Sequence, residues 1–375
     1  MEIRDVEPLP VGTPAPHRGG PNFLFVKLTT ADGRVGFGEC PWTEFRLATL
    51  EKLLDDMTRF VVGKDPHDVE QIRQELDQDS HWFNIPGPLQ AQVFGGVEMA
   101  CWDLVGKAAG EPVYNLFGGR LTDSIRAYTY IHYEWEPPAP AAEAADAVES
   151  YLDRGFSAVK LDPIPPFSGN REIGVDELDY AEDVVSAIRT RVGSECDIIL
   201  GTHGQLTTAG AIRFAHRLEP YDPLWLEEPV PPESPDQMAT VSDATDIPIA
   251  TGERLTSMHA FSQLLARDAV DVLQPNLGFV GLQGAKKIAG MAETHYAQVA
   301  PWLYCGPIQW AAALHLDATT PNFLVQEGIE TWDGFHRDVV TGAPTFRDGE
   351  FDLPTGPGLG VTVDEDVAAD HPPNR

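Results

Sequence analysis

Two glutamates stand where apolar stretches of the sequence end. Glu227 in WLEEP and Glu253 in ATGER follow two such stretches and are 26 residues apart. Two carboxylates that converge on one site repel each other unless a cation bridges them, and Mg²⁺ prefers hard oxygen ligands. An ordinary ion pair with a nearby Arg or Lys is the alternative for either residue. We predict that Glu227 and Glu253 hold Mg²⁺.

The same spacing draws attention to a position without a carboxylate. Counting back 26 residues from Glu227 reaches Gly201, where a third acid is expected. His203 lies two residues further on, and on a continuing strand it faces the same side. His203 is therefore a candidate proton donor or replacement metal ligand. A neutral loop histidine bonded to the backbone is the alternative.

Other reactive side chains end further apolar stretches. Lys160 in AVKLDP can bind a carboxylate or, with a lowered pKa, move a proton. It could equally be a structural partner of Asp162 or Glu227. Glu327 in VQEG could hydrogen-bond a developing enolate oxygen when protonated, or it could belong to a buried ion pair. The loops add two more candidates, Tyr304 and His132.

A repeat that begins near residue 124 positions these side chains. Eight β-type runs alternate with seven helical stretches, and the β-type runs are IRAYTYI, SAVKLD, DIILGT, PLWLEE, IPIATGE, VDVLQP, AQVAPW and FLVQE. The helical stretches cover 140–154, 176–192, 208–218, 234–243, 257–266, 282–295 and 307–316. Because each parallel strand needs a crossover helix, the alternation predicts an α/β fold with a closed, TIM-like (β/α)7β barrel. Chemistry in such barrels sits where strands end.

The residues before and after the repeat have a different pattern. An alternating run at 23–39, centred on Asp32-Gly33, predicts a hairpin, and the stretches 47–60, 67–77 and 91–109 have helical periodicity. We predict an α+β capping domain over 1–123 and a catalytic barrel over 124–340. A Gly/Pro-rich C-terminal segment, 341–375, should return to the cap.

Charge and composition exclude several kinds of partner. The formal charge is −32, with 58 acidic residues spread along the chain and only seven lysines. Such a field repels nucleic acid and anionic membranes. Dispersed acid with few lysines suits a high-salt cytoplasm, where salt screens the self-repulsion, so we predict a halophilic source.

The remaining composition fits a cytoplasmic globular protein. The chain has 42% hydrophobic residues but no run of about 18 apolar residues, so no membrane span is expected. The first ten residues, MEIRDVEPLP, lack the apolar region of a secretory signal. Four scattered cysteines without CxxC spacing predict free thiols in a reducing compartment.

Several motifs together resemble a known family. GVEMACWDLVGKAAGEPVYNLFGG, VKLTTADGRVGFGE, WLEEP, IATGERL, KKIAGMAE and PGLGV are similar to the mandelate racemase group of the enolase superfamily. The similarity runs over essentially the whole chain. THGQ, PLWLEEPV and VQEG resemble acid-sugar dehydratases of the galactonate and gluconate type.

This resemblance implies a reaction. A lyase of this type holds Mg²⁺ on three strand-end acids and abstracts the proton beside the carboxylate of a sugar acid. Loss of the β-hydroxyl from the enediolate then gives a 2-keto-3-deoxy acid. The family also implies a homo-oligomer, because its cap-and-barrel enzymes commonly form dimers or octamers.

Four residues match functional positions of the family. Glu227 and Glu253 match the second and third metal ligands. His203 matches the histidine that protonates the departing hydroxyl, and Glu327 matches the acid that faces the enediolate.

Other family positions are changed. Gly201 replaces the first metal-ligand aspartate. Trp302 stands where the dehydratases have a histidine base, and Asn276 stands where they have its aspartate partner. Asp162 lies where racemases of the group carry their catalytic lysine. The site therefore departs from the standard pattern.

Because Trp302 replaces the histidine base of the family, another group must accept the α-proton. Lys160 is the first choice for its position and basicity, ahead of Asp162, Tyr304 and His203. Cap loops should select the substrate, and an ordinary surface role is the alternative for Arg18. We expect substrate contacts from Arg18, Trp82, His132, Asp162 and Trp302.

Two other functions remain open. The same enolate chemistry could serve a racemase, epimerase or lactone cycloisomerase. The absent ligand and base also allow a barrel that binds a sugar acid without turnover.

Overall fold

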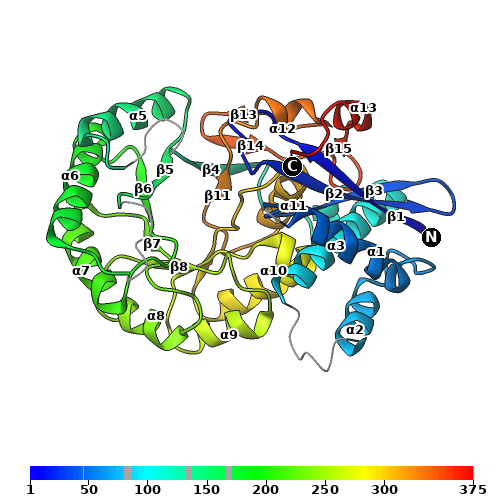
Figure 1. The fold of residues 1–375 in the computed structure, drawn as a ribbon, viewed down its shortest axis with the longest axis horizontal. Coiled ribbons are helices and arrows are strands. Elements are labelled where there is room, and N and C mark those ends of the chain that lie inside the picture. Colours follow the sequence, from blue (N-terminus) through cyan, green and yellow to red (C-terminus); the bar gives the residue numbers. More distant parts are fainter. Residues whose placement is uncertain (45, 80–86, 132–136, 165–170, 375) are drawn as a thin grey trace.

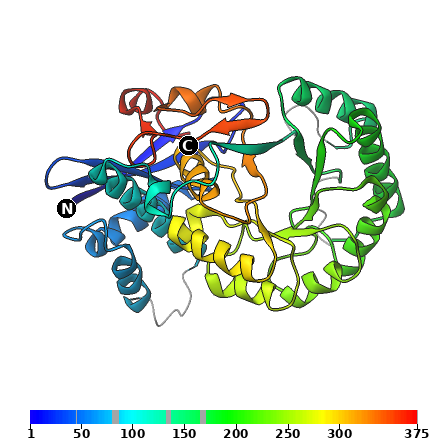
Figure 2. The same cartoon turned by 180° about the vertical axis from the view of Figure 1, so that it is seen from behind.

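A barrel of parallel strands, ringed by helices, lies beside a smaller α+β layer (Figures 1 and 2). The computed structural model describes residues 1–44, 46–79, 87–131, 137–164 and 171–374. Both chain ends lie on the side of the smaller layer.

The barrel strands follow one another in sequence order around the sheet. Within the described ranges they are β4 (Ser124–Tyr130), β5 (Ala158–Leu161), β6 (Asp197–Gly201), β7 (Trp225–Glu227), β8 (Ile249–Thr251), β9 (Val272–Leu273), β10 (Gln298–Val299) and β11 (Gln326–Gly328). The sheet closes because β11 pairs in parallel with β4, and Val299 forms a parallel bridge to Phe323. The predicted (β/α)7β barrel is confirmed.

A helix follows each strand except the last. The seven are α5 (Ala141–Asp153), α6 (Val175–Val192), α7 (Thr208–Leu218), α8 (Pro235–Ser242), α9 (Met258–Leu265), α10 (Leu277–Thr294) and α11 (Pro307–Ala318), as far as the structure describes the chain. Most lie within two residues of the predicted stretches. The exception is α10, which begins five residues before the predicted 282–295. Asn276 caps its first turn, and Gly281, with φ of 74°, breaks the helix near the point where the helical periodicity begins.

The smaller layer is an antiparallel sheet covered by helices. Its strands are β1 (Ile3–Gly12), β2 (Asn22–Thr30) and β3 (Val35–Cys40). The hairpin of β2 and β3 is confirmed, whereas β1 was not predicted. The helices are α1 (Leu47–Val61), α2 (Val69–Asp79), α3 (Pro88–Ala109) and the short α4 (Val113–Leu116).

The C-terminal segment contacts both layers. It contains α12 (Phe335–Asp338), β12 (Val340–Thr341), β13 (Phe346–Arg347), β14 (Glu350–Asp352), β15 (Thr362–Val363) and α13 (Glu365–Ala369). β14 pairs antiparallel with β4 of the barrel, while the backbone of Gly12 in the cap bonds to His371. The segment therefore extends the barrel sheet as well as reaching the cap.

Two buried cap carboxylates bind the starts of barrel helices. Glu98 of α3 accepts hydrogen bonds from the backbone N–H groups of Leu282 (2.6 Å) and Gln283 (2.9 Å), just after the break at Gly281. Glu39 of β3 accepts from three N–H groups at the start of α11, those of Gly306, Ile308 and Gln309. Carboxylates stabilise helix N-termini by satisfying unpaired N–H groups and opposing the helix dipole. A Cβ at Gly281 would lie 2.8 Å from the Glu98 carboxyl carbon, so this contact also requires the glycine.

Two further expectations can be compared with the structure. No described helix has both the length and the apolar character needed to cross a membrane. All four cysteines are buried free thiols.

Replacing Asp317 with Asn should stabilise the protein at neutral pH. Asp317 of α11 is buried, and neither carboxyl oxygen has a hydrogen-bond partner among the described residues. Burial raises the pKa of Asp317 well above its ordinary value. A raised folded-state pKa means that stability is greatest below the unfolded-state pKa and falls as pH rises towards the folded-state pKa. We expect Asp317→Asn to raise the free energy of unfolding at pH 7 by roughly 1.4 kcal/mol for each pH unit over which the wild-type carboxyl is kept protonated in the folded state only.

Urea unfolding at several pH values checks this prediction. The gain should shrink towards pH 4, because the wild-type carboxyl is then protonated in both states. A gain that is independent of pH would contradict the assigned cause.

Salt should stabilise this protein. Acidic residues on exposed faces include Asp55 and Asp56 of α1, Asp179 and Asp183 of α6, and Asp370. Their repulsion is screened as ionic strength rises. We expect the midpoint of thermal unfolding to rise from dilute buffer to molar KCl, by roughly 2–4 °C for each kcal/mol gained. A midpoint that is the same in both solutions would rule out halophilic adaptation.

Candidate active site

Lys160 lies at the centre of the charged groups at the barrel mouth. It is the third residue of β5 and is 1% exposed. Its ammonium is ion-paired with Glu227 Oε1 and lies 3.3 Å from Glu327 Oε1. Burial alone would lower the pKa of Lys160, but the charges of Glu227 and Glu327 oppose this effect and hold the pKa well above its ordinary value. Lys160 is therefore a cation in this arrangement.

Both partners of Lys160 are fixed by further hydrogen bonds. Glu227 Oε2 accepts from Trp225 Nε1 at 3.1 Å and from Gln274 Nε2 at 2.6 Å. Glu327 Oε2 accepts from the backbone N–H of Leu303 at 2.8 Å. The three charged side chains are thus held in place by β7, β9 and the loop after β10. Such support keeps charged groups in one geometry before substrate arrives.

Glu253 follows β8, next to the strand that carries Glu227. It is 3% exposed, and its Oε2 has no hydrogen-bond partner among the described residues. Burial raises its pKa well above the ordinary value, and the nearby charges of Glu228 and Glu227 add to this effect. Glu228 itself is neutralised by Arg254, whose Nη2 lies 2.7 Å from Glu228 Oε2.

The unpaired oxygen of Glu253 suits a hard divalent cation, whereas both oxygens of Glu227 already accept hydrogen bonds. Two acids at the end of the neighbouring strand β7, Glu228 and Glu227, disfavour the ionised form of Glu253. A cation would relieve this repulsion. Across the described ranges, no three His, Cys, Asp or Glu side chains form a metal-binding group, in keeping with glycine at position 201. Mg²⁺ is nevertheless commonly held by one or two carboxylates and several waters.

His203 forms a close pair with Asp162. Its Nδ1 lies 2.6 Å from Asp162 Oδ2, and its backbone has a φ of 48°, in the left-handed region. The charge of Asp162 is the largest influence on His203 and raises its pKa to about 10, against the opposing effect of burial. An imidazolium can donate a proton but cannot bind a metal ion. The arrangement favours the proton donor over the replacement ligand.

A cavity of about 170 Å³ brings most of the predicted catalytic residues together. Its lining consists of Tyr130, Lys160, His203, Trp302, Tyr304 and Glu327. These side chains come from the ends of five barrel strands, β4, β5, β6, β10 and β11, or from the loops that follow them. The volume suits a small, polar ligand more than a large one. The cavity is the candidate active site.

Trp302 and Asn276, two of the three changed family positions, have clear structural roles. The ring of Trp302 packs edge-on against Trp42 of the cap, with centroids 4.8 Å apart, and forms one wall of the cavity. Asn276 Oδ1 accepts from the backbone N–H of Gly278 at 2.9 Å and from Gln309 Nε2 at 3.0 Å. Asn276 therefore caps α10.

Other predicted site residues do not join this cavity. Arg18 lies 3.8 Å from Glu330 and 3.7 Å from Asp333, and it lines a separate cavity between the cap and α12. The structure therefore does not place Arg18 at the substrate. Trp82 and His132 lie outside the described residues.

Tyr130 is a cavity residue that the sequence analysis missed. Its ring centroid lies 5.6 Å from Lys160 Nζ and 6.5 Å from the His203 ring. Burial raises the pKa of Tyr130 well above its ordinary value, so the phenol stays neutral. Tyr130 is the last residue of β4 and the next-to-last residue of the first β-type run, IRAYTYI, so the strand-end rule applied to the other runs would have identified it.

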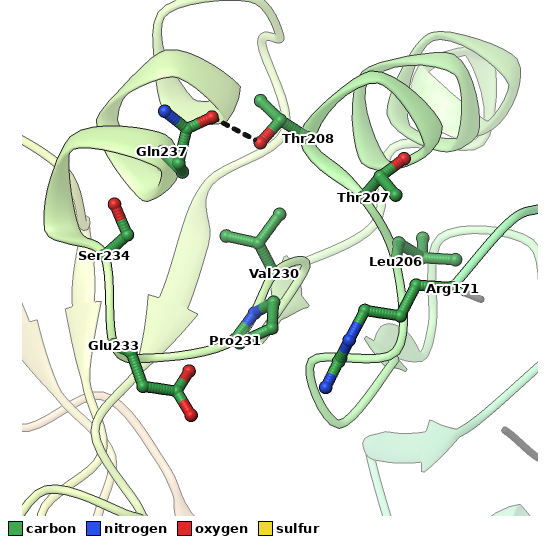
Figure 3. A pocket seen from close by; sticks show the side chains of 9 residues that line it. All are labelled: Arg171, Leu206, Thr207, Thr208, Val230, Pro231, Glu233, Ser234 and Gln237. Carbon is green, nitrogen blue, oxygen red and sulfur yellow. Dashed lines mark hydrogen bonds between the residues drawn. The ribbon is translucent and has the colours of Figure 1, made fainter. Parts of the chain in front are cut away.

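A second, larger cavity of about 380 Å³ lies near the same strand ends. It is bounded by the loops after β6 and β7 and by the starts of α7 and α8 (Figure 3). Arg171 and Glu233 are its charged residues, and the Arg171 guanidinium donates to the carbonyl of Gly204. None of the predicted catalytic residues lines it, so it is not the candidate catalytic cavity.

Comparisons with known proteins identify the family. Residues 3–118 match the mandelate racemase/muconate lactonizing enzyme N-terminal domain, and residues 143–367 match the enolase C-terminal domain-like family. The chain belongs to the mandelate racemase/muconate lactonizing enzyme group of the enolase superfamily, an enzyme family.

Individual relatives agree with this placement. The chain is 33% identical to a D-gluconate/D-galactonate dehydratase of Picrophilus torridus, over 97% of this chain and 92% of the relative. It is also 33% identical to a D-xylonate dehydratase of Haloferax volcanii, over 98% and 90%. A solved mandelate racemase/muconate lactonizing enzyme from Sulfitobacter sp. superposes with a TM-score of 0.94 at 39% identity, covering 100% of this chain and 96% of that chain.

Proposed function

We propose that this protein is a hydro-lyase that dehydrates an aldonic or aldaric acid to a 2-keto-3-deoxy acid. The observation that carries the proposal is the cavity in which a protonated histidine, a buried lysine and a buried glutamate face the same space. The dehydratase relatives support the reaction type. The sugar acid is the small-molecule partner, and neither nucleic acid nor membrane is involved.

Lys160 and Glu327 act on the carboxylate end of the substrate. The Lys160 ammonium, already held between two carboxylates, can attract the substrate carboxylate. Burial is the largest influence on Glu327 and raises its pKa, while the Lys160 ammonium lowers it. Glu327 hydrogen-bonds an enediolate oxygen once it carries a proton, and Glu227 then remains the charged partner of Lys160. Because Lys160 is an ammonium, removal of the α-proton needs an acceptor other than Lys160 or the protonated His203.

His203 donates the proton that leaves with the β-hydroxyl. Hydroxide is a poor leaving group, so elimination requires a general acid beside it. His203 is protonated at neutral pH, lines the cavity and is 44% exposed at its side chain, so it can reach a substrate there.

Glu227 and Glu253 would hold Mg²⁺, which when bound supplies positive charge that stabilises the developing negative charge of the substrate. Glu253 contributes the buried oxygen that lacks a partner. Glu227 is kept in position for this role by Trp225 and Gln274.

Screening the purified protein against a panel of aldonic and aldaric acids tests the proposal. The assay is run in high salt with Mg²⁺, and 2-keto acid formation is measured with and without a chelator. Product that disappears with the chelator supports an Mg²⁺-dependent dehydratase. Product that survives the chelator would contradict the metal assignment alone.

The same panel in deuterated water separates the rival functions. Exchange of the α-proton without a 2-keto product would indicate a racemase, epimerase or cycloisomerase. Tight binding with neither product nor exchange would indicate a non-catalytic sugar-acid-binding barrel.

Two further properties belong to the proposal. The buried free thiols support a reducing, cytoplasmic location. A homo-oligomer, which the family resemblance implies, is tested by light scattering of the purified protein.

A further inference from the structure

The space above Gly201 is filled by a side chain from the neighbouring strand. Leu161 of β5 pairs with Leu200 of β6, so Asp162 and Gly201 follow at adjacent positions. A Cβ on Gly201 would lie 2.1 Å from Asp162 Oδ1 and 3.3 Å from Lys160 Cε. The first distance is far shorter than any real contact, so no side chain fits at position 201 while Asp162 keeps this position.

The other oxygen of the same carboxylate binds His203. Asp162 Oδ2 lies 2.6 Å from His203 Nδ1, and this contact leaves Nε2 as the nitrogen available to the cavity. The Asp162 side chain is 17% exposed, so most of the carboxylate is shielded from water. The absence of a side chain at Gly201 therefore leaves room for the Asp162 carboxylate, which binds His203.

We propose that Asp162 is a positioning residue, which occupies the space left by Gly201 and holds the His203 ring so that its Nε2–H faces the cavity. The inference rests on the proposed function, in which His203 is the general acid. It also gives a reason for the absent carboxylate at 201. The acid in this part of the site is Asp162, which follows β5 instead of ending β6, and it binds the proton donor His203.

The charges around His203 agree with this role. Asp162 and Glu253 favour the imidazolium, whereas the Lys160 ammonium opposes it. Tyr130 lies close to the same ring and is neutral. Of these groups, Asp162 has the largest effect on the pKa of His203. Its removal should therefore change the titration of His203 more than any other single substitution.

Two variants remove the contact in different ways. Asp162→Asn keeps the shape of the side chain but removes its charge. Gly201→Ala changes no ionisable group, but its Cβ displaces the Asp162 carboxylate. Asp176→Asn is the matched control, because it removes the same charge from an exposed position at the start of α6.

Histidine NMR titration of the full-length protein is the test, with the His203 signal assigned by its loss in His203→Asn. The wild-type His203 pKa should be near 10. It should fall by at least about two units in both Asp162→Asn and Gly201→Ala and stay unchanged in Asp176→Asn. Gly201→Ala should have no further effect in the Asp162→Asn background, because the charge that it displaces is already gone.

This titration does not depend on turnover, so it separates the inference from the proposed function. A wild-type His203 pKa near 6.5, or an unchanged pKa in a folded Asp162→Asn protein, would overturn the inference even in an active dehydratase. A lowered pKa in a protein that dehydrates no sugar acid would leave the Asp162–His203 pair established and the proposed function wrong.

Discussion

His203→Asn should lower the rate of 2-keto acid formation by about 10²–10⁴, the usual contribution of a general acid. Asn cannot supply a proton to the departing hydroxyl. The fold should persist, because the His203 side chain is 44% exposed and hydrogen-bonds to the side chain of Asp162. Exchange of the substrate α-proton with solvent deuterium should survive, because exchange precedes loss of the hydroxyl. Both rates can be followed by NMR in one sample.

The matched control is His216→Asn. His216 lies on α7, is exposed, and its ring hydrogen-bonds to the carbonyl of Ala244. This variant should dehydrate sugar acids at the wild-type rate. If His203→Asn also retained dehydration, the acid would have to be another group of the cavity.

Glu253→Gln should abolish metal-dependent turnover while making the protein more stable. The buried carboxylate has a raised pKa, so its ionisation costs folding free energy as pH rises above the unfolded-state value. A neutral amide removes that cost at pH 7. It also removes a metal ligand, so the affinity for Mg²⁺ should fall by more than the roughly 10–100-fold loss seen for outer-shell changes. Calorimetric titration with Mg²⁺ and urea unfolding without metal measure the two effects separately.

Glu233→Gln provides the comparison for this experiment. Glu233 is an exposed acid on the loop after β7 and lines the second cavity (Figure 3). Its replacement should change neither Mg²⁺ affinity nor turnover. Wild-type turnover in Glu253→Gln would disprove the metal assignment.

The barrel could be predicted because its pattern is local. Each strand and the helix that follows it lie within about 30 residues, and parallel pairing demands that order. The start of α10 could not be predicted in this way, since its break at Gly281 depends on Glu98 from a distant cap helix. β1 was also missed, because Pro8 and Pro10 in its sequence disfavour a strand and only its pairing with β2 reveals it.

The positions of the site residues could be predicted from the sequence better than their protonation states. The strand-end rule identified Lys160, His203 and Glu327, because all parallel strands of a barrel end at one mouth. The sequence favoured Lys160 as the base, whereas the two carboxylates that surround it make it a cation. The contact of Asp162 with His203 depends on the register between β5 and β6, which a single sequence does not reveal.

Glu39 and Glu98 limit how this enzyme can be re-engineered. Because the cap helps to select the substrate, the specificity of a cap-and-barrel enzyme could be changed by domain exchange, in which the cap of one relative is joined to the barrel of another. Here Glu98 binds N–H groups just after the break in α10 and Glu39 binds those at the start of α11, so a foreign cap without these two acids would leave buried N–H groups of both helices unsatisfied. A chimaera is therefore expected to fold only when the donor cap brings equivalent acids or when the recipient helices are recapped.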